Sequence, residues 1–458
     1  MSVPRFAVVG HPNKGKSSIV ATLAEDDAVQ ISPLPGTTSA ARAYPLRVDG
    51  ETLYELIDTP GFQRPRAVLD WLKRHDRGAE ARPAVVAELV AKHRDDPLFH
   101  DECELLAPIL DGAGILYVVD GSRPYGREYE AEMEVLRWTG RPRMALINMI
   151  GAGNHVAEWQ TALGQYFAIV RVFDAQRADF EKRIELLRAF GALDESWQPQ
   201  LRRAADVLIA ERARRRKRAA LEIAALLRDA LTMTERAPTE HEQPAPEEVA
   251  RLRTRLEKRI AKREERAREA VQEIYGHRSV PREETEASLL DADVFSSTTF
   301  SAFGLSTAQL AATGALSGTA AAGSIDLLLG GASLGLAAAM GAVVGGAGAV
   351  LGARRLAKVR VLGQRLGGRE LVVGPVVAPN FPWVLLGRAV LHQRLVAERN
   401  HARREKFLLD VREDARLADS IDAATRRRLV RLFKELRNEP GGDAEAALAE
   451  EIEPLLGR

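Results

Sequence analysis

One short motif near the start of the chain restricts its fold more than any other feature. Residues 10–17 read G-H-P-N-K-G-K-S, which matches the pattern G-x-x-x-x-G-K-[ST]. The motif follows Arg5–Val9, an apolar run typical of a buried strand, and precedes a helical pattern over Ser17–Leu23. In this order of strand, loop and helix the motif forms a phosphate-binding loop.

The residue types of this loop define its chemistry. Glycines let the backbone curl until its N–H groups point at a phosphate, beside the positive N-terminal end of the next helix. Lys16 is expected to reach the β- and γ-phosphates, and the Ser17 hydroxyl to bind Mg²⁺. The other expected nucleotide-binding residues of this segment are Asn13, Lys14, Gly15 and Ser18.

A second motif, D-T-P-G, ends the strand-like run Leu53–Ile57. Asp58 there can hold the Mg²⁺ shell from the opposite side, and the backbone N–H of Gly61 can approach a γ-phosphate. Between the two motifs lies P-G-T-T, in which Thr38, or alternatively Thr37, can close over Mg²⁺ and the γ-phosphate. The simpler interpretation of P-G-T-T is a Pro-Gly turn with incidental threonines.

Residues 1–195 alternate between strand and helix patterns, which predicts an α/β domain with a doubly wound, mostly parallel sheet. Asp49-Gly50 separates two strand-like runs and predicts a hairpin. Residues 63–110 are mostly helical and indicate an insertion before the fourth strand. The expected strands beyond Arg5–Val9 are Tyr44–Val48, Leu53–Ile57, Ile115–Val119, Met144–Ile147 and Ala168–Phe173.

Taken together, G-H-P-N-K-G-K-S-S, P-G-T-T and D-T-P-G resemble the Era/TrmE/EngA-like P-loop GTPases. The resemblance covers about residues 1–195 and implies a Ras-like domain that binds GTP and GDP with Mg²⁺. It implies that Lys16 and Ser17 bind phosphate and metal, that Thr38 belongs to the first switch, and that Asp58 and Gly61 belong to the second. The whole chain also resembles a bacterial family that joins such a domain to a Gly-rich C-terminal region of unknown function.

The chain departs from this family where the base should bind. The family motif N-K-x-D appears here as N-M-I-G, so Asn148 is retained but Gly151 stands in place of the carboxylate that pairs with guanine. The resemblance favours GTP, and ATP or low selectivity stays open. Asp174, after the sixth strand, either compensates for the lost carboxylate or is simply an exposed residue at a strand end.

A second departure concerns the attacking water. Phe62 follows D-T-P-G where Ras-like enzymes place a glutamine, and an aromatic ring cannot orient water by hydrogen bonding. Gln63 is the neighbouring candidate for positioning water. Some relatives hold K⁺ partly through the loop asparagine that Asn13 matches, so the resemblance implies K⁺-stimulated hydrolysis. The alternative is that Asn13 only caps the loop.

Residues 196–290 read as a charged helical connector. Strand patterns vanish there, and Arg212–Arg218 forms a basic cluster that fits anionic headgroups, nucleic acid or a solvated helix face. The three prolines of Ala237–Pro246 predict a linker. Residues 247–275 form an amphipathic helix that is expected to pack in a bundle or to self-associate.

Residues 291–360 are rich in Gly and Ala, and Asp326 is the single charge between Val294 and Gly352. Two uncharged runs, Phe303–Ile325 and Leu327–Gly352, predict a helical hairpin. Their length and G-xxx-G spacing fit insertion into a membrane through residues 303–352, with the basic flank that starts at Arg354 on the cytoplasmic side. A hairpin buried in a soluble core explains the same residues. Residues 361–458 are expected to form an α-rich C-terminal domain.

Length and composition limit the remaining choices. At ~150 residues per domain, 458 residues predict about three domains. The 65 basic and 64 acidic residues nearly cancel, so total charge gives no sign of a nucleic-acid partner, without excluding one. The lone Cys103 and the lack of a secretory signal predict a cytoplasmic protein, with inner-membrane association if the hairpin inserts.

The sequence therefore predicts a GTP-binding switch whose C-terminal module associates with a membrane or a partner. Two other functions stay open. One is a nucleotide-binding interaction protein with negligible hydrolysis, since Phe62 replaces glutamine. The other is an Era-like ribosome or RNA assembly factor, by resemblance alone.

Overall fold

The computed structural model divides into two compact units, Met1–Arg212 with Glu398–Arg404, and Ala213–Ala397 with Glu405–Arg458. The division falls within the long helix α8 (Gln198–Thr232). The described residues are 3–25, 40–239, 244–276, 293–306, 309–310, 313, 349–352, 360–361, 364–365, 369–398, 421–439 and 441–457.

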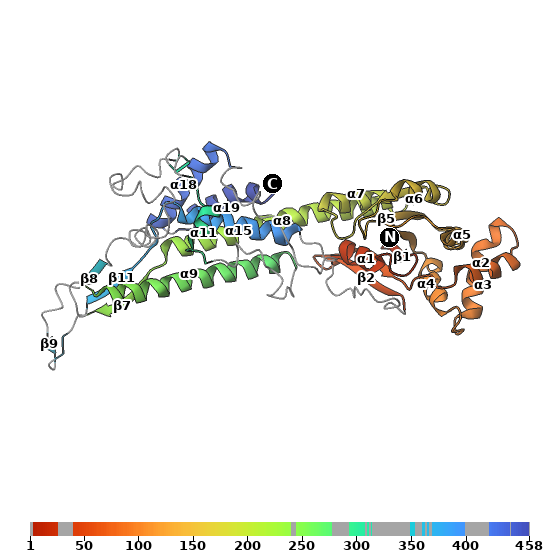
Figure 1. Cartoon of the computed structure of the whole chain (residues 1–458), viewed down its shortest axis with the longest axis horizontal. Coiled ribbons are helices and arrows are strands. Elements are labelled where there is room, and N and C mark those ends of the chain that lie inside the picture. The colour runs from red at the N-terminus through yellow and green to blue at the C-terminus, as the bar shows by residue number, and fades with distance from the viewer. Residues whose placement is uncertain are drawn as a thin grey trace. The chain divides into compact units, whose positions relative to one another are not determined.

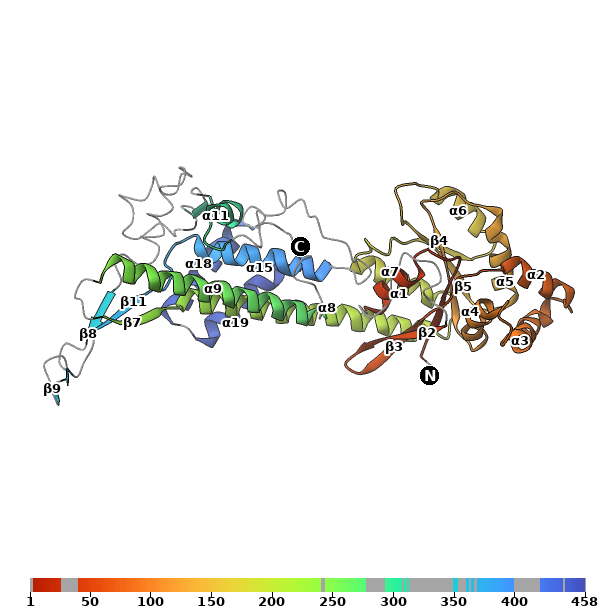
Figure 2. The ribbon, with the colours of Figure 1, turned by 60° about the horizontal axis from the view of Figure 1, so that its bottom comes forward.

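The first unit is built on a six-stranded sheet in the order β2-β3-β1-β4-β5-β6. Strand β2 runs antiparallel to β3, and the other neighbours pair in parallel, so the predicted α/β fold is confirmed. Figures 1 and 2 show this sheet with helices around it. The strands are β1 (Arg5–Val9), β2 (Arg42–Val48), β3 (Glu51–Asp58), β4 (Gly114–Asp120), β5 (Arg143–Asn148) and β6 (Ile169–Val172).

Alternating side chains of the central strand enter two different cores. Phe6 and Val8 of β1 pack under α1 (Lys16–Ala24), α7 (Phe180–Gly191) and the start of α8, whereas Ala7 and Val9 pack against the helices of the other face. The sheet is therefore covered on both faces, as its apolar strands predict. The helices of the second face are α2 (Pro65–Arg74), α3 (Arg82–His93), α4 (His100–Leu110), α5 (Glu130–Trp138) and α6 (Val156–Leu163).

Local sequence explains the β2–β3 hairpin and the helical stretch after β3. Asp49 and Gly50 have φ values of 50° and 82°, the pair of positive angles that a two-residue hairpin turn needs. Residues 63–110 hold α2, the short 3₁₀ helix η1 (Ala79–Ala81), α3 and α4. A second 3₁₀ helix, η2 (Arg127–Tyr129), leads into α5. Cys103 is buried in the core of this face.

The second unit is mostly helical among its described residues, as predicted. Helices α8 and α9 (Pro246–Ile274) run side by side (Figures 1 and 2), and their apolar faces share one core with α15 (Phe381–Glu398). Residues 381–393 of α15 are all buried, so this helix is enclosed by the others. The remaining helices are α11 (Ser297–Phe303), α18 (Ala423–Asn438), α19 (Gly442–Ile452) and the 3₁₀ helix η4 (Glu453–Gly457).

A small antiparallel sheet in this unit corrects two expectations. The stretch predicted as a linker contains most of β7 (Glu235–Thr239), which pairs with β11 (Arg369–Val373). Proline is tolerated there because β7 is an edge strand in the order β7-β11-β8. Strand β8 (Ala349–Gly352) pairs with β11 on its other side, so the predicted helical run does not extend over these four residues. A separate short pair joins β9 (Arg360–Val361) and β10 (Gln364–Arg365).

The rest of the predicted Gly/Ala hairpin, residues 307–308, 311–312 and 314–348, lies outside the described residues. Within the described part of the chain, no helix combines the length and the apolar character needed to cross a membrane.

The amphipathic face of α9 is covered by its own chain. Leu252, Leu256 and Ile260 are buried in the core that α8 and α15 share. Self-association of residues 247–275 would therefore have to use another surface of the helix.

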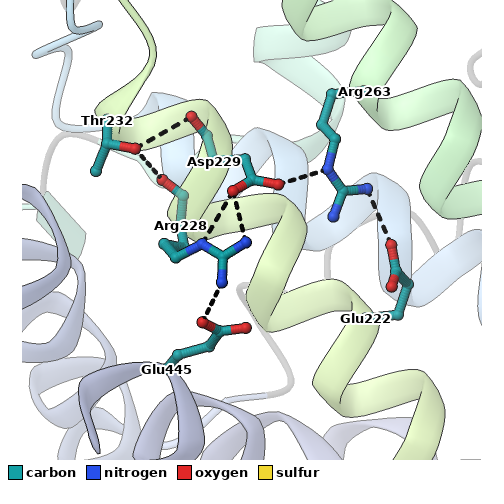
Figure 3. Close-up of polar contacts among 6 residues, drawn as sticks. All are labelled: Glu222, Arg228, Asp229, Thr232, Arg263 and Glu445. Atoms are coloured by element: carbon teal, nitrogen blue, oxygen red, sulfur yellow. Dashed lines mark hydrogen bonds and ion pairs between the residues drawn. The ribbon is translucent and has the colours of Figure 1, made fainter. Parts of the chain in front are cut away.

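A network of ion pairs ties α8, α9 and α19 together (Figure 3). Arg263 of α9 donates from Nε to Oδ2 of Asp229 at 2.7 Å and from Nη1 to Oε1 of Glu222 at 2.9 Å. Arg228 donates to Oδ1 of the same Asp229 and also to Glu445 of α19. Three acidic and two basic side chains thus form one connected network of charged hydrogen bonds where three helices meet.

The basic cluster at 212–218 also has acidic partners. Arg212 pairs with Glu181, and Arg216 lies 3.7 Å from Glu453. These pairs fit the interpretation of a solvated helix face.

Candidate phosphate-binding site

The loop between β1 and α1 has the backbone shape that its glycines require. Gly10, Asn13 and Gly15 have φ values of 145°, 59° and 80°. A Cβ atom on Gly10 would lie 2.4 Å from the carbonyl oxygen of Val118, and one on Gly15 would lie 2.3 Å from Nδ2 of Asn148. Both positions therefore exclude any side chain.

Lys16 is held at the centre of this loop. Its Nζ donates to the carbonyl oxygens of His11 at 3.0 Å and Gly10 at 3.3 Å. Burial lowers the pKa of Lys16 to about 8, and the negative charges of Asp58 and Glu132 offset part of that effect. A buried cation with carbonyl partners is well prepared to exchange them for phosphate oxygens.

Ser17 and Asp58 come together from the two motifs. The Ser17 hydroxyl donates to Oδ2 of Asp58 at 2.8 Å, and Asp58 is buried at the end of β3. The neighbouring Thr59 hydroxyl donates to the carbonyl oxygen of Val8 at 2.8 Å, which fixes the end of β3 against β1. A hydroxyl and a carboxylate in contact form an oxygen donor set that fits Mg²⁺.

The segment after Asp58 packs directly on the phosphate loop. A Cβ atom on Gly61 would lie 2.6 Å from the backbone N of Pro12, and the Phe62 N–H donates to the Gly10 carbonyl at 3.2 Å. Phe62 is fully buried in the core, whereas the Gln63 side chain is exposed.

The other expected site residues divide into three groups. Asn13 is exposed on the loop and Ser18 is half-buried in α1. Lys14 is buried, with Nζ 5.6 Å from the centre of the Tyr129 ring, and burial lowers the pKa of this lysine. Thr37 and Thr38 lie outside the described residues.

Asn148 connects three segments at the expected base site. Its Nδ2 donates to the Lys14 carbonyl at 3.2 Å, and its Oδ1 accepts from the Ala175 N–H at 3.1 Å. Asp174 accepts the N–H groups of Gln176 and Arg177 at 2.9 and 3.1 Å, so its carboxylate caps its own turn.

Two buried glutamates next to the loop were not singled out from the sequence. Glu132 of α5 contacts His11 Nδ1 at 2.8 Å and accepts from the Tyr117 hydroxyl at 2.9 Å. Burial raises the pKa of Glu132. Glu102 of α4 accepts the N–H groups of Gln63 and Arg64. Each stands in a helix pattern where a glutamate is usually exposed.

The fold and this arrangement are those of a P-loop GTPase domain. Residues 5–149 match the family model described as 50S ribosome-binding GTPase. Residues 160–454 match the model described as Domain of unknown function (DUF3482). Because the second match covers more than half of the chain, the protein belongs to the DUF3482 family, joined here to a GTPase domain.

Curated relatives are similar over parts of their length. GTPase Der of Nitrosococcus oceani is 31% identical over 119 residues, 25% of this chain and 25% of that protein. GTPase Der of Mycoplasma pneumoniae is 48% identical over 60 residues, 13% of each chain. GTPase Der of Pseudothermotoga lettingae is 22% identical over 213 residues, 46% of this chain and 43% of that protein. The chain thus spans less than half the length of these relatives.

Among solved structures, Aquifex aeolicus Era bound to GDP.AlF4- aligns with a TM-score of 0.29 at 18% identity, covering 60% of this chain and 90% of that one. Era in complex with MgGDPNP and a fragment of 16S ribosomal RNA aligns with a TM-score of 0.30 at 17% identity, covering 60% and 89%.

Proposed function

We propose that the chain is a GTP-binding switch that hydrolyses GTP to GDP and phosphate with Mg²⁺. The observation that carries this proposal is the contact between Ser17 and Asp58, beside Lys16 in the glycine loop. Lys16 would bind the β- and γ-phosphates in place of its carbonyl partners, and Ser17 would bind Mg²⁺, with Asp58 behind it. Bound Mg²⁺ would supply positive charge to the phosphates. Thr38 is proposed as a further ligand from the first switch.

We expect intrinsic hydrolysis to be slow. The buried ring of Phe62 offers no hydrogen bond to water, and Gln63 is proposed as the residue that positions it. A protein that stays long in its triphosphate state suits a switch better than a metabolic enzyme. Single-turnover hydrolysis of labelled GTP tests this. The wild-type protein should hydrolyse GTP slowly, and Lys16→Ala should show no hydrolysis. Equal rates for the two proteins would contradict the proposal.

Stimulation by K⁺ is proposed through Asn13. Helix α1 begins at Lys16, and its N-cap residue is Gly15, which makes no side-chain capping hydrogen bond. An exposed amide at this point of the loop is suited to help hold a monovalent cation near the phosphates. Hydrolysis in KCl should exceed hydrolysis in NaCl, and Asn13→Ala should remove the difference. Equal turnover in the two salts would end this idea.

Preference for guanine is also a proposal. Asn148 can still fix the base pocket by tying the phosphate loop to the β6–α7 segment, but Gly151 offers no carboxylate to the base. We therefore expect GTP to bind more tightly than ATP by a smaller margin than a complete N-K-x-D motif would give. Competition of GTP and of ATP, each against labelled GDP, measures that margin.

The C-terminal unit is proposed to dock the switch on a membrane or a partner. The Gly/Ala-rich residues 303–352 favour the membrane, whereas similarity to a model described as 50S ribosome-binding GTPase favours an RNA-containing partner. Co-sedimentation of the full chain with anionic liposomes and, separately, with ribosomes distinguishes them. Binding to neither would contradict both.

A further inference from the structure

Helix α4 contacts the chain on both sides of the phosphate site through two side chains. Oε1 of Glu102 accepts the N–H groups of Gln63, at 3.0 Å, and of Arg64. Oε2 of Glu104, two residues further on, accepts the N–H of Ala41 at 3.1 Å. Gln63 and Arg64 are the second and third residues after Gly61, and Ala41 directly precedes β2.

Both contact points lie close to Asp58. Arg42, the residue after Ala41, is paired with Asp58 across the β2–β3 ladder. On the other side, Gly61 packs on Pro12, and the Phe62 N–H reaches the Gly10 carbonyl. The segments that α4 holds are therefore the backbone immediately next to the proposed phosphate and metal residues.

The Glu102 carboxylate accepts the N–H groups of Gln63 and Arg64, which have no other acceptor in this loop. Helix α2 begins after Arg64, whose side chain makes no capping hydrogen bond, and the first helical position is Pro65. A buried carboxylate at this helix N-terminus, in contact with two N–H groups, both caps the helix and meets its positive end. Phe62 fills the core just before it, so the backbone of residues 61–64 is fixed from two directions.

We infer that Glu102 and Glu104 are positioning residues that set the backbone of the two segments flanking the nucleotide, with Glu102 presenting Gln63 toward the γ-phosphate side. Both glutamates contact backbone N–H groups of these segments and are not among the residues proposed to bind the nucleotide. If exchange of GTP for GDP moves the Gly61 segment, the hydrogen bonds of Glu102 transmit that movement to α4. The same hydrogen bonds limit how far the segment can move. This inference rests on the proposed function.

The first measurement needs no nucleotide. Amide hydrogen exchange of the peptide containing residues 62–66 reports the hydrogen bonds to Glu102. Glu102→Leu should speed its exchange at least tenfold, whereas Glu102→Gln, which keeps an acceptor oxygen, should stay near wild type. Asp101→Ala, on the same turn of α4 with no hydrogen bond of its side chain to the described residues, is the matched control.

The second measurement separates positioning from folding. Glu102→Leu should lower the single-turnover rate at least tenfold and leave the Kd for GDP within threefold, with Glu102→Gln restoring most of the rate. Glu104→Leu should weaken a non-hydrolysable GTP analogue more than GDP. If Glu102→Leu does not fold, Glu102→Asp can replace it, because it withdraws the carboxylate by one methylene. This variant should also lower the single-turnover rate while leaving the Kd for GDP nearly unchanged.

Different results would contradict the proposed function and the positioning role of Glu102. Absence of nucleotide binding by wild type would overturn the proposed function, whatever the exchange data show. A wild type that binds and hydrolyses GTP, with Glu102→Leu altering only the unfolding temperature and neither rate nor GTP/GDP preference, would overturn the positioning role alone.

Discussion

The Ser17 hydroxyl donates a hydrogen bond of 2.8 Å to Oδ2 of Asp58, although 41 residues separate the two in sequence. The first follows the phosphate loop and the second ends β3, so the parallel pairing of β1 with β3 is what brings them together. Two short motifs thus meet as one oxygen donor set, on which the account of Mg²⁺ binding depends.

Asp58→Asn should weaken GTP binding in Mg²⁺ by 10- to 100-fold, about 1.4–2.8 kcal/mol. The amide keeps the shape of the side chain but removes the charge that would support the metal. Titration with labelled GTP in Mg²⁺ and again in EDTA measures the effect, which should shrink in EDTA. Asp49→Asn, in the β2–β3 turn, is the control and should change neither value.

Gly61→Ala should damage the site sterically. The added methyl would lie 2.6 Å from the backbone N of Pro12, so either the phosphate loop or the Gly61 segment must shift. We expect a loss of ~1–3 kcal/mol in stability and weaker binding of GTP analogues, measured by thermal unfolding and titration. Gly442→Ala, where the new methyl would meet nothing within 4 Å, should be neutral. Wild-type behaviour of Gly61→Ala would refute the close packing.

Arg263→Leu should destabilise the helical unit by ~1–3 kcal/mol, because Asp229 and Glu222 would each lose a charged donor. Urea unfolding followed by circular dichroism measures the loss. Arg266→Leu, one helical turn away and exposed, should cost no more than about 0.5 kcal/mol. Similar values for the two variants would mean that the network adds little to stability.

Acid should destabilise the protein through His392. Burial, with a smaller effect from the positive charge of Arg268, lowers the pKa of His392 to about 3, and Gln272 contacts its ring at 3.4 Å. The unfolded chain protonates this histidine near pH 6.5 while the folded chain does not. Its contribution is therefore fully present above pH 6.5 and falls by about 1.4 kcal/mol per pH unit as the pH drops toward 3.

Urea unfolding of wild type and His392→Gln at pH 7.5 and pH 5 isolates this contribution. The variant should lose less stability than wild type on acidification, and His100→Gln, an exposed position, should behave as wild type. An equal loss in wild type and His392→Gln would contradict a neutral buried His392.

Local patterns in the sequence were enough for the sheet and the loop. The strand before Gly10 and the Asp49-Gly50 turn are short-range signals, and the structure confirms both. The prolines of Ala237–Pro246 led to the wrong prediction of a linker. Pro238 is tolerated because it lies in an edge strand, and that strand forms only by pairing with distant residues, Pro238 with Glu370, 132 residues away.

The side chains that support the site could not be predicted for a similar reason. Glu102 and Glu132 stand in charged helical stretches, where nothing local distinguishes a buried carboxylate from a solvated one. Their contacts form only in the folded chain, where Glu102 meets Gln63 and Arg64 and Glu132 meets His11. At the expected base site the residue itself was predictable, because Asn148 is what remains of the N-K-x-D motif. Its hydrogen bond with the Ala175 N–H was not predictable from the sequence.

Calorimetric titration of the purified chain with GTP, GDP, ATP and ADP in Mg²⁺, alongside Lys16→Ala, is the direct test of nucleotide binding at the loop between β1 and α1. We expect saturable binding of GTP and GDP, weaker binding of the adenine nucleotides, and loss of binding in Lys16→Ala. No heat of binding with any of the four nucleotides, or the same affinity in Lys16→Ala, would contradict this expectation.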